Sequence, residues 1–153
     1  MSEFGSGQDV NDPSADFPIR ETVEDHSGAH RAFLITYRSV GLGFTVTAEE
    51  EGTAGLGYRF SAFSETSPYS ALGALRRKMY RALATRHITR SEGYWRLLHD
   101  TLRGRITVDA DGDLALVVDG TPLTLEDLRQ ILAMHEGWDF KLQIVDYSED
   151  VSG

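Results

Sequence analysis

The sequence predicts an α+β domain with an antiparallel sheet of about six strands and two main helices packed on one face, in the order βββ-α-ββ-α-β. Several segments alternate apolar and polar residues with a period of two, which is typical of half-buried strands. Two other segments carry apolar residues on one helical face behind an N-cap residue. The strands follow one another through short, glycine-bearing turns, and such connections favour antiparallel pairing.

Length and local composition set the expected domain boundaries. The chain has 153 residues, which suits one domain. Residues 1–29 lack apolar periodicity and are rich in Gly, Ser, Asp and Pro, so we expect a disordered acidic tail. Its opening letters, "MSEFGSG", look like a cloning remnant and are left out of the functional reasoning. A single α+β domain is expected over 30–148, with a short acidic tail over 149–153.

The first half of this domain is predicted to begin with three strands. Short connections at Gly41 and at "EEEGTAG" are typical of hairpins, so the strands form a meander. The residues that alternate with polar neighbours are Phe33, Ile35 and Tyr37, then Leu42, Phe44, Val46 and Ala48, then Leu56, Tyr58, Phe60 and Ala62.

A helix is predicted next, from an N-cap at Ser67 and a first helical residue at Pro68 to about Arg86. Its outer face is basic and carries Arg77, Lys78 and Arg81. Residues 89–102 admit a short helix or an irregular strand, of which we favour a helical turn. The apolar stripe of the helix consists of Tyr69, Leu72, Leu75, Met79, Tyr80 and Leu83.

The second half is predicted to be a hairpin, a helix and a final strand. Residues 105–108 and 114–118 flank "DADGD", whose Asp-Gly step is a turn signal. Thr124 caps the helix with Asp127 at the N3 position, and Gly137 follows its end. The expected buried face of the helix is Leu125, Leu128, Ile131 and Leu132, and the final strand alternates through Trp138, Phe140, Leu142 and Ile144.

Composition and motifs argue against several classes of function. The chain has no cysteine, which excludes disulfides and thiol chemistry, and its net charge of -9 argues against nucleic acid as a partner. No apolar run is long enough to span a membrane, so we expect a cytoplasmic protein. "DADGDLALVVDG" matches only the first half of an EF-hand loop and is predicted to be a solvated hairpin tip. We predict no catalytic residue, cofactor or metal site.

Two segments resemble PDZ domains. "SVGLGFTV" contains the Gly-Leu-Gly-Phe loop, and "LALVVDGTPLTLEDLRQILAMHEGWDFKLQIV" is similar in pattern to the segment with the groove helix. The resemblance implies that backbone N–H groups of Leu42, Gly43 and Phe44 bind a peptide carboxylate. PDZ domains link these parts by a very short helix, whereas about seventy residues separate them here. We favour the other explanation, a glycine-bearing turn into an ordinary strand.

A second resemblance spans Arg31 to Asp150. "RAFLITYRSVGLGFTVTAEE", "RRKMYRALATRHI", "RGRITVDADGD" and "VVDGTPLTLEDLRQILAMHEGWDFKLQIVDYSED" are similar to a family of bacterial proteins of unknown function. In that family a strand meander, a basic helix, a Gly-Arg-Ile strand and a Gly-Trp-x-Phe-Lys-Leu ending follow in this order. The resemblance supports the order of elements and implies no activity.

These observations together predict a non-catalytic protein-interaction or regulatory module with a protein partner, which the basic helix face suggests is acidic. A solvated helix face is the plainer explanation of that charge. The alternatives are a PDZ-like binder of peptide C-termini and an enzyme whose site is assembled from residues distant in sequence. The residues predicted to contact a partner are Arg77, Lys78 and Arg81 on the helix, and His135, Glu136 and Trp138 at the "HEGW" corner.

Overall fold

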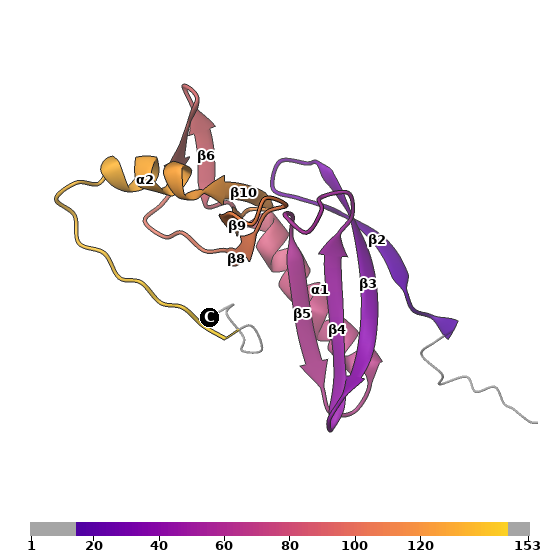
Figure 1. Cartoon of the computed structure of the whole chain (residues 1–153). Coiled ribbons are helices and arrows are strands. Elements are labelled where there is room, and N and C mark those ends of the chain that lie inside the picture. Colours follow the sequence, from indigo (N-terminus) through magenta and orange to yellow (C-terminus); the bar gives the residue numbers. More distant parts are fainter. Residues whose placement is uncertain (1–14, 147–153) are drawn as a thin grey trace, which may run out of the picture.

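A computed structural model describes residues 15–146 of the chain (Figure 1). Within these residues it contains three antiparallel sheets and two helices, so the expected α+β class is confirmed. The expected single sheet is divided into sheets of four, two and three strands. The four-stranded sheet has the order β2(Ile19–Glu24), β3(His30–Val40), β4(Gly43–Glu50) and β5(Arg59–Ser64).

The first strand, β2, lies in the segment expected to be a disordered tail, and for residues 15–29 that expectation is wrong. β2 pairs antiparallel with β3 from Ile19 opposite Ile35 to Glu24 opposite His30. Ile19 and Val23 pack against the core. Two apolar residues are too sparse a pattern to identify a strand from sequence when the strand that pairs with it is unknown. Residues 1–14 and 149–153, the rest of the expected tails, lie outside the described residues.

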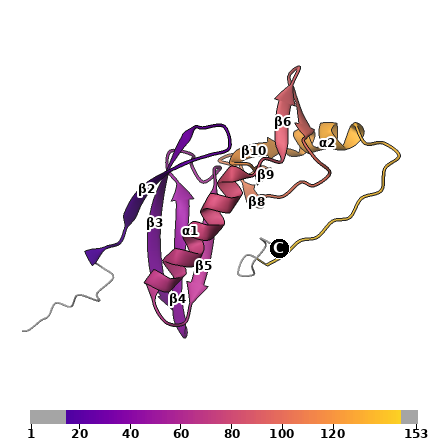
Figure 2. The same ribbon diagram turned by 180° about the vertical axis from the view of Figure 1, so that it is seen from behind.

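Helix α1 (Pro68–Ala84) covers one face of the four-stranded sheet (Figure 2). It begins as predicted, because the Ser67 side chain accepts a hydrogen bond from the Ser70 N–H and Pro68 occupies the first turn. Tyr69 and Tyr80, expected on the buried stripe, are instead exposed. The buried residues of the helix join the first hydrophobic cluster, which is Phe17, Phe33, Ile35, Val46, Ala48, Tyr58, Ala62, Ala71, Leu72, Leu75, Met79 and Leu83.

The segment after α1 forms a two-stranded hairpin, so the expected helical turn over 89–102 is wrong. Strands β6 (Ile88–Ser91) and β7 (Tyr94–Leu97) pair antiparallel around Glu92 and Gly93. Both loop residues have positive φ, 54° and 83°. Two consecutive left-handed residues match the right-handed twist of a hairpin. This turn geometry outweighs the helical spacing of Tyr94, Leu98 and Leu102.

The third sheet contains the predicted hairpin of β8 (Arg105–Val108) and β9 (Leu114–Val118). A further strand, β10 (Thr121–Thr124), pairs with β9 through a turn at Asp119 and Gly120 and was not predicted. The order is β10-β9-β8, so β8 is at one edge.

Helix α2 (Leu125–Ala133) continues directly from β10 and packs on β7, β9 and β10. Of its expected buried face only Ile131 is buried, whereas Leu125 and Leu132 are exposed. The two helices do not share one face of one sheet, because α1 covers the four-stranded sheet and α2 packs with the smaller strands. A second cluster therefore forms from Ile88, Val118, Leu123 and Ile131, with Trp95, Leu97, Leu102 and Leu116 packed against it.

The predicted cap of α2 is confirmed. The Thr124 hydroxyl accepts from the Asp127 N–H at 3.0 Å, and the Asp127 carboxylate accepts from the Thr124 N–H at 2.9 Å. Replacing Thr124 with alanine should lower the free energy of unfolding by about 1 kcal/mol, because an N-terminal N–H loses its acceptor. Thr124→Ser keeps the hydroxyl and should restore most of the loss in urea denaturation. Equal losses for the two variants would contradict the capping role.

The last expected strand is not formed. Residues 138–146 include no strand, although Trp138, Phe140, Leu142 and Ile144 alternate with polar residues. Such alternation creates two different faces only when the backbone pairs with another strand. Within residues 15–146 no strand edge pairs with this segment.

Candidate functional site

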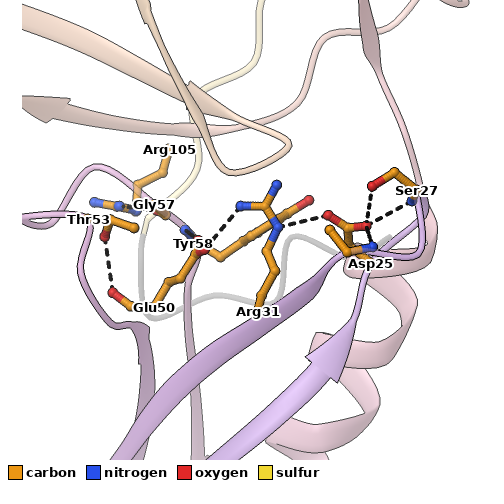
Figure 3. A network of polar contacts seen from close by, with 9 residues as sticks. Asp25, Ser27, Arg31, Glu50, Thr53, Gly57, Tyr58 and Arg105 are labelled. Carbon is orange, nitrogen blue, oxygen red and sulfur yellow. Dashed lines mark hydrogen bonds and ion pairs between the residues drawn. The ribbon is translucent and has the colours of Figure 1, made fainter.

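A polar junction lies where the loop after β2, the ends of β3 to β5 and the β9–β10 turn meet. Arg31 on β3 is at its centre and is three-quarters buried. Its Nε is 2.8 Å from Asp25 Oδ2 and its Nη1 is 3.0 Å from Glu50 Oε2 (Figure 3). The guanidinium also lies over the Tyr58 ring, 5.2 Å from the centroid. One cation therefore joins two carboxylates and an aromatic ring.

The Asp25 side chain is almost fully buried, with 1% of its surface exposed. Its Oδ1 accepts hydrogen bonds from the Ser27 N–H, the Ser27 hydroxyl and the Ala29 N–H (Figure 3). Burial by itself raises the pKa of this carboxyl. The hydrogen bonds from Ser27, Arg31 and Ala29 outweigh burial, so the pKa lies well below its ordinary value. Asp25 is thus a buried anion stabilised by donors.

Tyr58 closes the other side of the junction. Burial raises the pKa of its hydroxyl far above the ordinary value, the negative charge of Asp119 raises it further, and Arg31 opposes both. The hydroxyl is buried and has no hydrogen-bond partner among the described residues. Its ring lies against the backbone of Gly120, where an added Cβ would be 2.5 Å from Cε2 of Tyr58. The β9–β10 turn therefore needs glycine at this point.

Residues of the second half complete the junction. Arg105 on β8 donates from Nη2 to the carbonyl oxygens of Gly55 and Gly57, at 3.0 and 2.8 Å. Asp119 accepts from the His87 and Ile88 N–H groups at 2.7 and 3.0 Å. These bonds connect the β4–β5 loop to β8 and the β9–β10 turn to the start of β6.

A pocket of about 130 Å³ opens on this junction, lined in part by Asp25, Arg31, Arg86, Trp95 and Asp119. Its carboxylates already have partners in Arg31 and in backbone N–H groups. His26, Ser27, Ile88 and Thr121 also line the pocket, and the Ser27 hydroxyl donates to Asp25 Oδ1 at 2.7 Å. We interpret the arrangement as a structural junction that fixes the two hydrophobic clusters relative to each other.

The sequence did not single out these residues. Asp25 and Arg31 are close in sequence, but Glu50, Tyr58 and Asp119 join them only through strand pairing and the β9–β10 turn. One local signal was present, because Asp25 precedes Ser27 and Gly28, and aspartate commonly accepts from the backbone two residues ahead.

The predicted basic face of α1 is smaller in the structure. Arg77 and Arg81 are exposed, but Lys78 is half-buried and its Nζ donates to the Ser61 carbonyl at 2.9 Å. The neighbouring Arg76 pairs with Glu21 at 2.8 Å. Two exposed arginines remain of the expected cluster.

The Gly-Leu-Gly-Phe stretch forms a two-residue loop at the tip of the β3–β4 hairpin. Gly41 and Leu42 are the loop, and Val40 lies opposite Gly43. Phe44 is already paired with Ser39 on one side and Ser64 on the other. Since β4 is paired on both edges, a peptide has no edge to join beside it. The PDZ resemblance is not confirmed.

The "DADGD" hairpin tip brings Asp109, Asp111 and Asp113 together, with carboxylate oxygens within 4.8 Å of one another. Asp109 Oδ1 accepts from the N–H groups of Asp111 and Asp113 at 2.9 and 3.0 Å. These hydrogen bonds close the turn. Exposed acidic side chains are common at such tips.

The predicted "HEGW" corner turns the chain out of α2. His135 Nδ1 is 3.0 Å from the Ile131 carbonyl oxygen, and the rings of His135 and Trp138 meet edge to face at 5.3 Å. Gly137 has a φ of 91°, a conformation that favours glycine at a helix end. Glu136 is exposed. The corner sets the direction in which the chain leaves the helix.

The segment after this corner, residues 138–145, is called the C-terminal arm here. It leaves the end of α2 as an extended chain and bends back toward the sheets (Figure 1). Its four alternating apolar side chains are largely exposed: Trp138 72%, Phe140 86%, Leu142 76% and Ile144 71%.

A second exposed apolar group lies on the β8–β9 hairpin and is called the apolar rim. It consists of Ile106, Val108 and Leu114, which are 55%, 57% and 43% exposed. The register places Ile106 opposite Leu116 and Val108 opposite Leu114. The rim is therefore on the same sheet face as Leu116, part of the second cluster, and is the uncovered end of that face.

Two family matches cover most of the chain. Residues 15–84 match a family described as Domain of unknown function (DUF7686), and residues 87–149 match Domain of unknown function (DUF7713). The matches meet at the end of α1, and each contains one of the two hydrophobic clusters. No curated protein and no solved structure shows significant similarity to the chain. The protein thus combines two regions that are each similar to a domain family of unknown function, which agrees with the expected resemblance to uncharacterised proteins.

Proposed function

We propose that this protein is a non-catalytic interaction module and that its C-terminal arm is the binding element. The observation that carries the proposal is the run of large apolar side chains at residues 138–145, on an extended backbone that joins none of the sheets within residues 15–146. Each apolar side chain of this size gains about 1.5–3 kcal/mol when it leaves water. A segment that exposes four of them in succession is suited to binding another surface.

The form of the arm indicates how it binds. An extended segment with free backbone groups joins the edge of a sheet by main-chain hydrogen bonds, while alternate side chains fill one face. Asp139, Lys141 and Gln143 would then face the opposite side. The predicted contact residues His135 and Trp138 belong to the same element, because their ring contact holds the start of the arm.

The basic face supports an interaction role less strongly. Arg77 and Arg81 are exposed on α1 and suit an acidic partner, but the structure directs Lys78 to the sheet. Exposed single charges contribute little to affinity in comparison with buried apolar side chains. We therefore assign binding to the arm and keep the double variant Arg77→Glu/Arg81→Glu as a comparison.

Photo-crosslinking in the native cells tests this function. A benzophenone amino acid at position 140 should give a defined crosslinked product on irradiation. The same probe at Glu65, an exposed polar position outside the arm, serves as the matched control and should give none. A further variant carries the probe at position 138 together with Leu142→Ser and Ile144→Ser. This variant should give no crosslinked product, because it lacks half of the apolar side chains of the arm.

The results of this experiment distinguish the arm from the basic face of α1 as the binding surface. The product at position 140 should persist in the Arg77→Glu/Arg81→Glu background. Its loss there would move the binding site to α1, and equal products at positions 140 and 65 would rule out the arm as a specific binding element.

The localisation and origin of the protein are predictions. Neither helix in residues 15–146 has the length and apolar character needed to cross a membrane. We propose a cytoplasmic protein of bacterial origin, in keeping with the lack of cysteines and the family resemblance.

A further inference from the structure

We infer that the pocket at the polar junction binds the carboxylate group of a small organic acid. The pocket has a volume of about 130 Å³. Its walls come from the loop after β2 and from β3 on one side, and from β6, β7, β10 and the β9–β10 turn on the other. The pocket therefore lies between the two halves of the chain, and such boundaries are preferred places for small-molecule sites.

The two arginines that line the pocket have N–H groups left to donate. Arg31 donates from Nε and Nη1 to two carboxylates. Arg86 donates from Nε to the Ile88 carbonyl and from Nη2 to the Thr89 hydroxyl. Within residues 15–146, Arg31 Nη2 and Arg86 Nη1 have no hydrogen-bond partner. Because a guanidinium carries five N–H groups, each arginine keeps at least two donors for a ligand.

The two carboxylates of the pocket, in contrast, already accept hydrogen bonds. Asp25 accepts from the Ser27 hydroxyl, from Arg31 and from two backbone N–H groups. Asp119 accepts from two backbone N–H groups, and its Oδ1 is 2.8 Å from His87 Nδ1. A carboxylate has about four acceptor positions, so little acceptor capacity remains. The pocket thus offers donors, and it favours a ligand that supplies acceptors.

A buried hydroxyl beside the pocket is a further donor. Tyr58 is 8% exposed, and its hydroxyl has no hydrogen-bond partner among the described residues. Figure 3 shows its side chain beside Arg31. The charges of Asp119, Arg31 and Asp25 act on this hydroxyl, and all three residues line the pocket. A buried hydroxyl without an acceptor costs free energy, and a ligand oxygen held by Arg31 is an acceptor that it can use.

The charge of the pocket favours a carboxylate over a phosphate. The charged residues that line it are two arginines and two aspartates, so their formal charges cancel when histidine is neutral. A phosphate dianion would meet both aspartates without any excess of positive charge to offset the repulsion. A carboxylate carries one negative charge, and its two oxygens accept parallel hydrogen bonds from a guanidinium.

The other lining residues suit a short hydrocarbon group. Ile88 and Trp95, which belong to or pack against the second cluster, give the pocket an apolar wall. A cavity of about 150 Å³ holds benzene, so a pocket of this volume accepts a chain or ring of at most about six carbons. The ligand class is therefore a small monocarboxylic acid, with its charged end at the arginines and its hydrocarbon against this wall.

Butyrate is the probe for the first test. The chain has two tryptophans, Trp95 and Trp138, so Trp138→Phe leaves the indole N–H of Trp95 as a single peak in a nitrogen-15 NMR spectrum. Butyrate should shift this peak saturably with a Kd of about 1 mM, well within the affinity ceiling for so small a ligand. Butyramide has the same shape without the charge, and it should bind at least about tenfold more weakly, as should inorganic phosphate.

Arg86→Gln is the test variant, measured in the same Trp138→Phe chain. Arg86 is exposed and lies outside the Arg31 ion pairs, so the fold should persist. The Kd for butyrate should rise about tenfold or more, because one of the two guanidiniums is lost. Arg86→Lys keeps the charge without the paired donors and should raise the Kd about threefold. The matched control is Arg81→Gln, an exposed arginine that does not line the pocket, and its Kd should stay within about twofold.

The results decide whether the pocket is a carboxylate site. A saturable shift that Arg86→Gln weakens and Arg81→Gln preserves supports the inference. The inference is overturned by the lack of a saturable shift up to about 50 mM butyrate, or by equal losses in Arg86→Gln and Arg81→Gln. Binding of butyramide or phosphate as tight as that of butyrate also overturns it. The described residues that line the pocket lie outside the C-terminal arm, so these results leave the proposed function of the arm unchanged.

Discussion

Replacing Arg31 with methionine should lower the free energy of unfolding by about 3 kcal/mol, one of the largest losses expected from a single substitution in this protein. Methionine keeps much of the side-chain volume but removes the charge. Asp25, whose side chain is almost fully buried, then loses its cation, and Glu50 loses the same partner. An uncompensated buried carboxylate costs more than the ion pair itself contributes. Urea denaturation monitored by tryptophan fluorescence measures the loss.

Arg38→Met is the matched control for this substitution. Arg38 lies on the same strand but is exposed, so its replacement should change stability by about 0.5 kcal/mol or less. A loss as large as that of Arg31→Met would show that charge on β3, and not the junction, is responsible.

The pH dependence gives the Arg31 prediction a second signature. The folded pKa of Asp25 is lowered, so its contribution to stability is present above the unfolded pKa of about 3.9 and is lost as pH falls toward the folded value. In Arg31→Met the folded pKa should rise, because burial is no longer opposed by the guanidinium. The stability difference between the two proteins should therefore be largest near neutral pH and should shrink below about pH 4. A difference that stays constant to pH 2 would contradict the role of Asp25.

Replacing Gly120 with alanine should lower the free energy of unfolding by about 2–4 kcal/mol. Part of this loss is backbone strain, because Gly120 has a φ of 73°. The other part is steric, since the new Cβ would meet Tyr58 Cε2 at 2.5 Å and Arg31 Nη1 at 3.1 Å. The ring belongs to the first cluster and cannot move away without disturbing the junction.

Gly112→Ala isolates the strain contribution. Gly112 has a φ of 84° in the β8–β9 turn, and an added Cβ there meets nothing within 4 Å. We expect a loss of about 1 kcal/mol for this control, measured in parallel by thermal denaturation. The excess in Gly120→Ala reports the contact between the β9–β10 turn and Tyr58. Equal losses in the two variants would show that this contact does not stabilise the protein.

Local signals in the sequence determined both helices and most hairpins. Ser67 and Pro68 begin α1, and Thr124 with Asp127 begins α2, because capping depends on backbone groups within one turn. The alternation along β3 and β4 and the Asp-Gly step between β8 and β9 likewise act over a few residues. Such interactions require no knowledge of the rest of the chain.

Tertiary structure decided which elements meet. β2 has too few apolar residues to be recognised alone, and it becomes a strand because β3 supplies its ladder. Arg31, Glu50 and Tyr58 form the junction only after strand pairing brings distant residues together. The division into two hydrophobic clusters is also a matter of packing, since α2 has an amphipathic sequence but buries only Ile131.

The C-terminal arm shows most clearly the difference between what the sequence determines and what the tertiary structure decides. Its sequence determines which side chains would share one face if the segment became a strand, because apolar and polar residues alternate with a period of two. Whether that backbone becomes a strand depends on an edge to pair with, and none of the sheets within residues 15–146 includes the arm. Sequence specifies the side chains of a strand, but its hydrogen-bond partner is a property of the tertiary structure, because main-chain N–H and C=O groups are the same in every residue except proline.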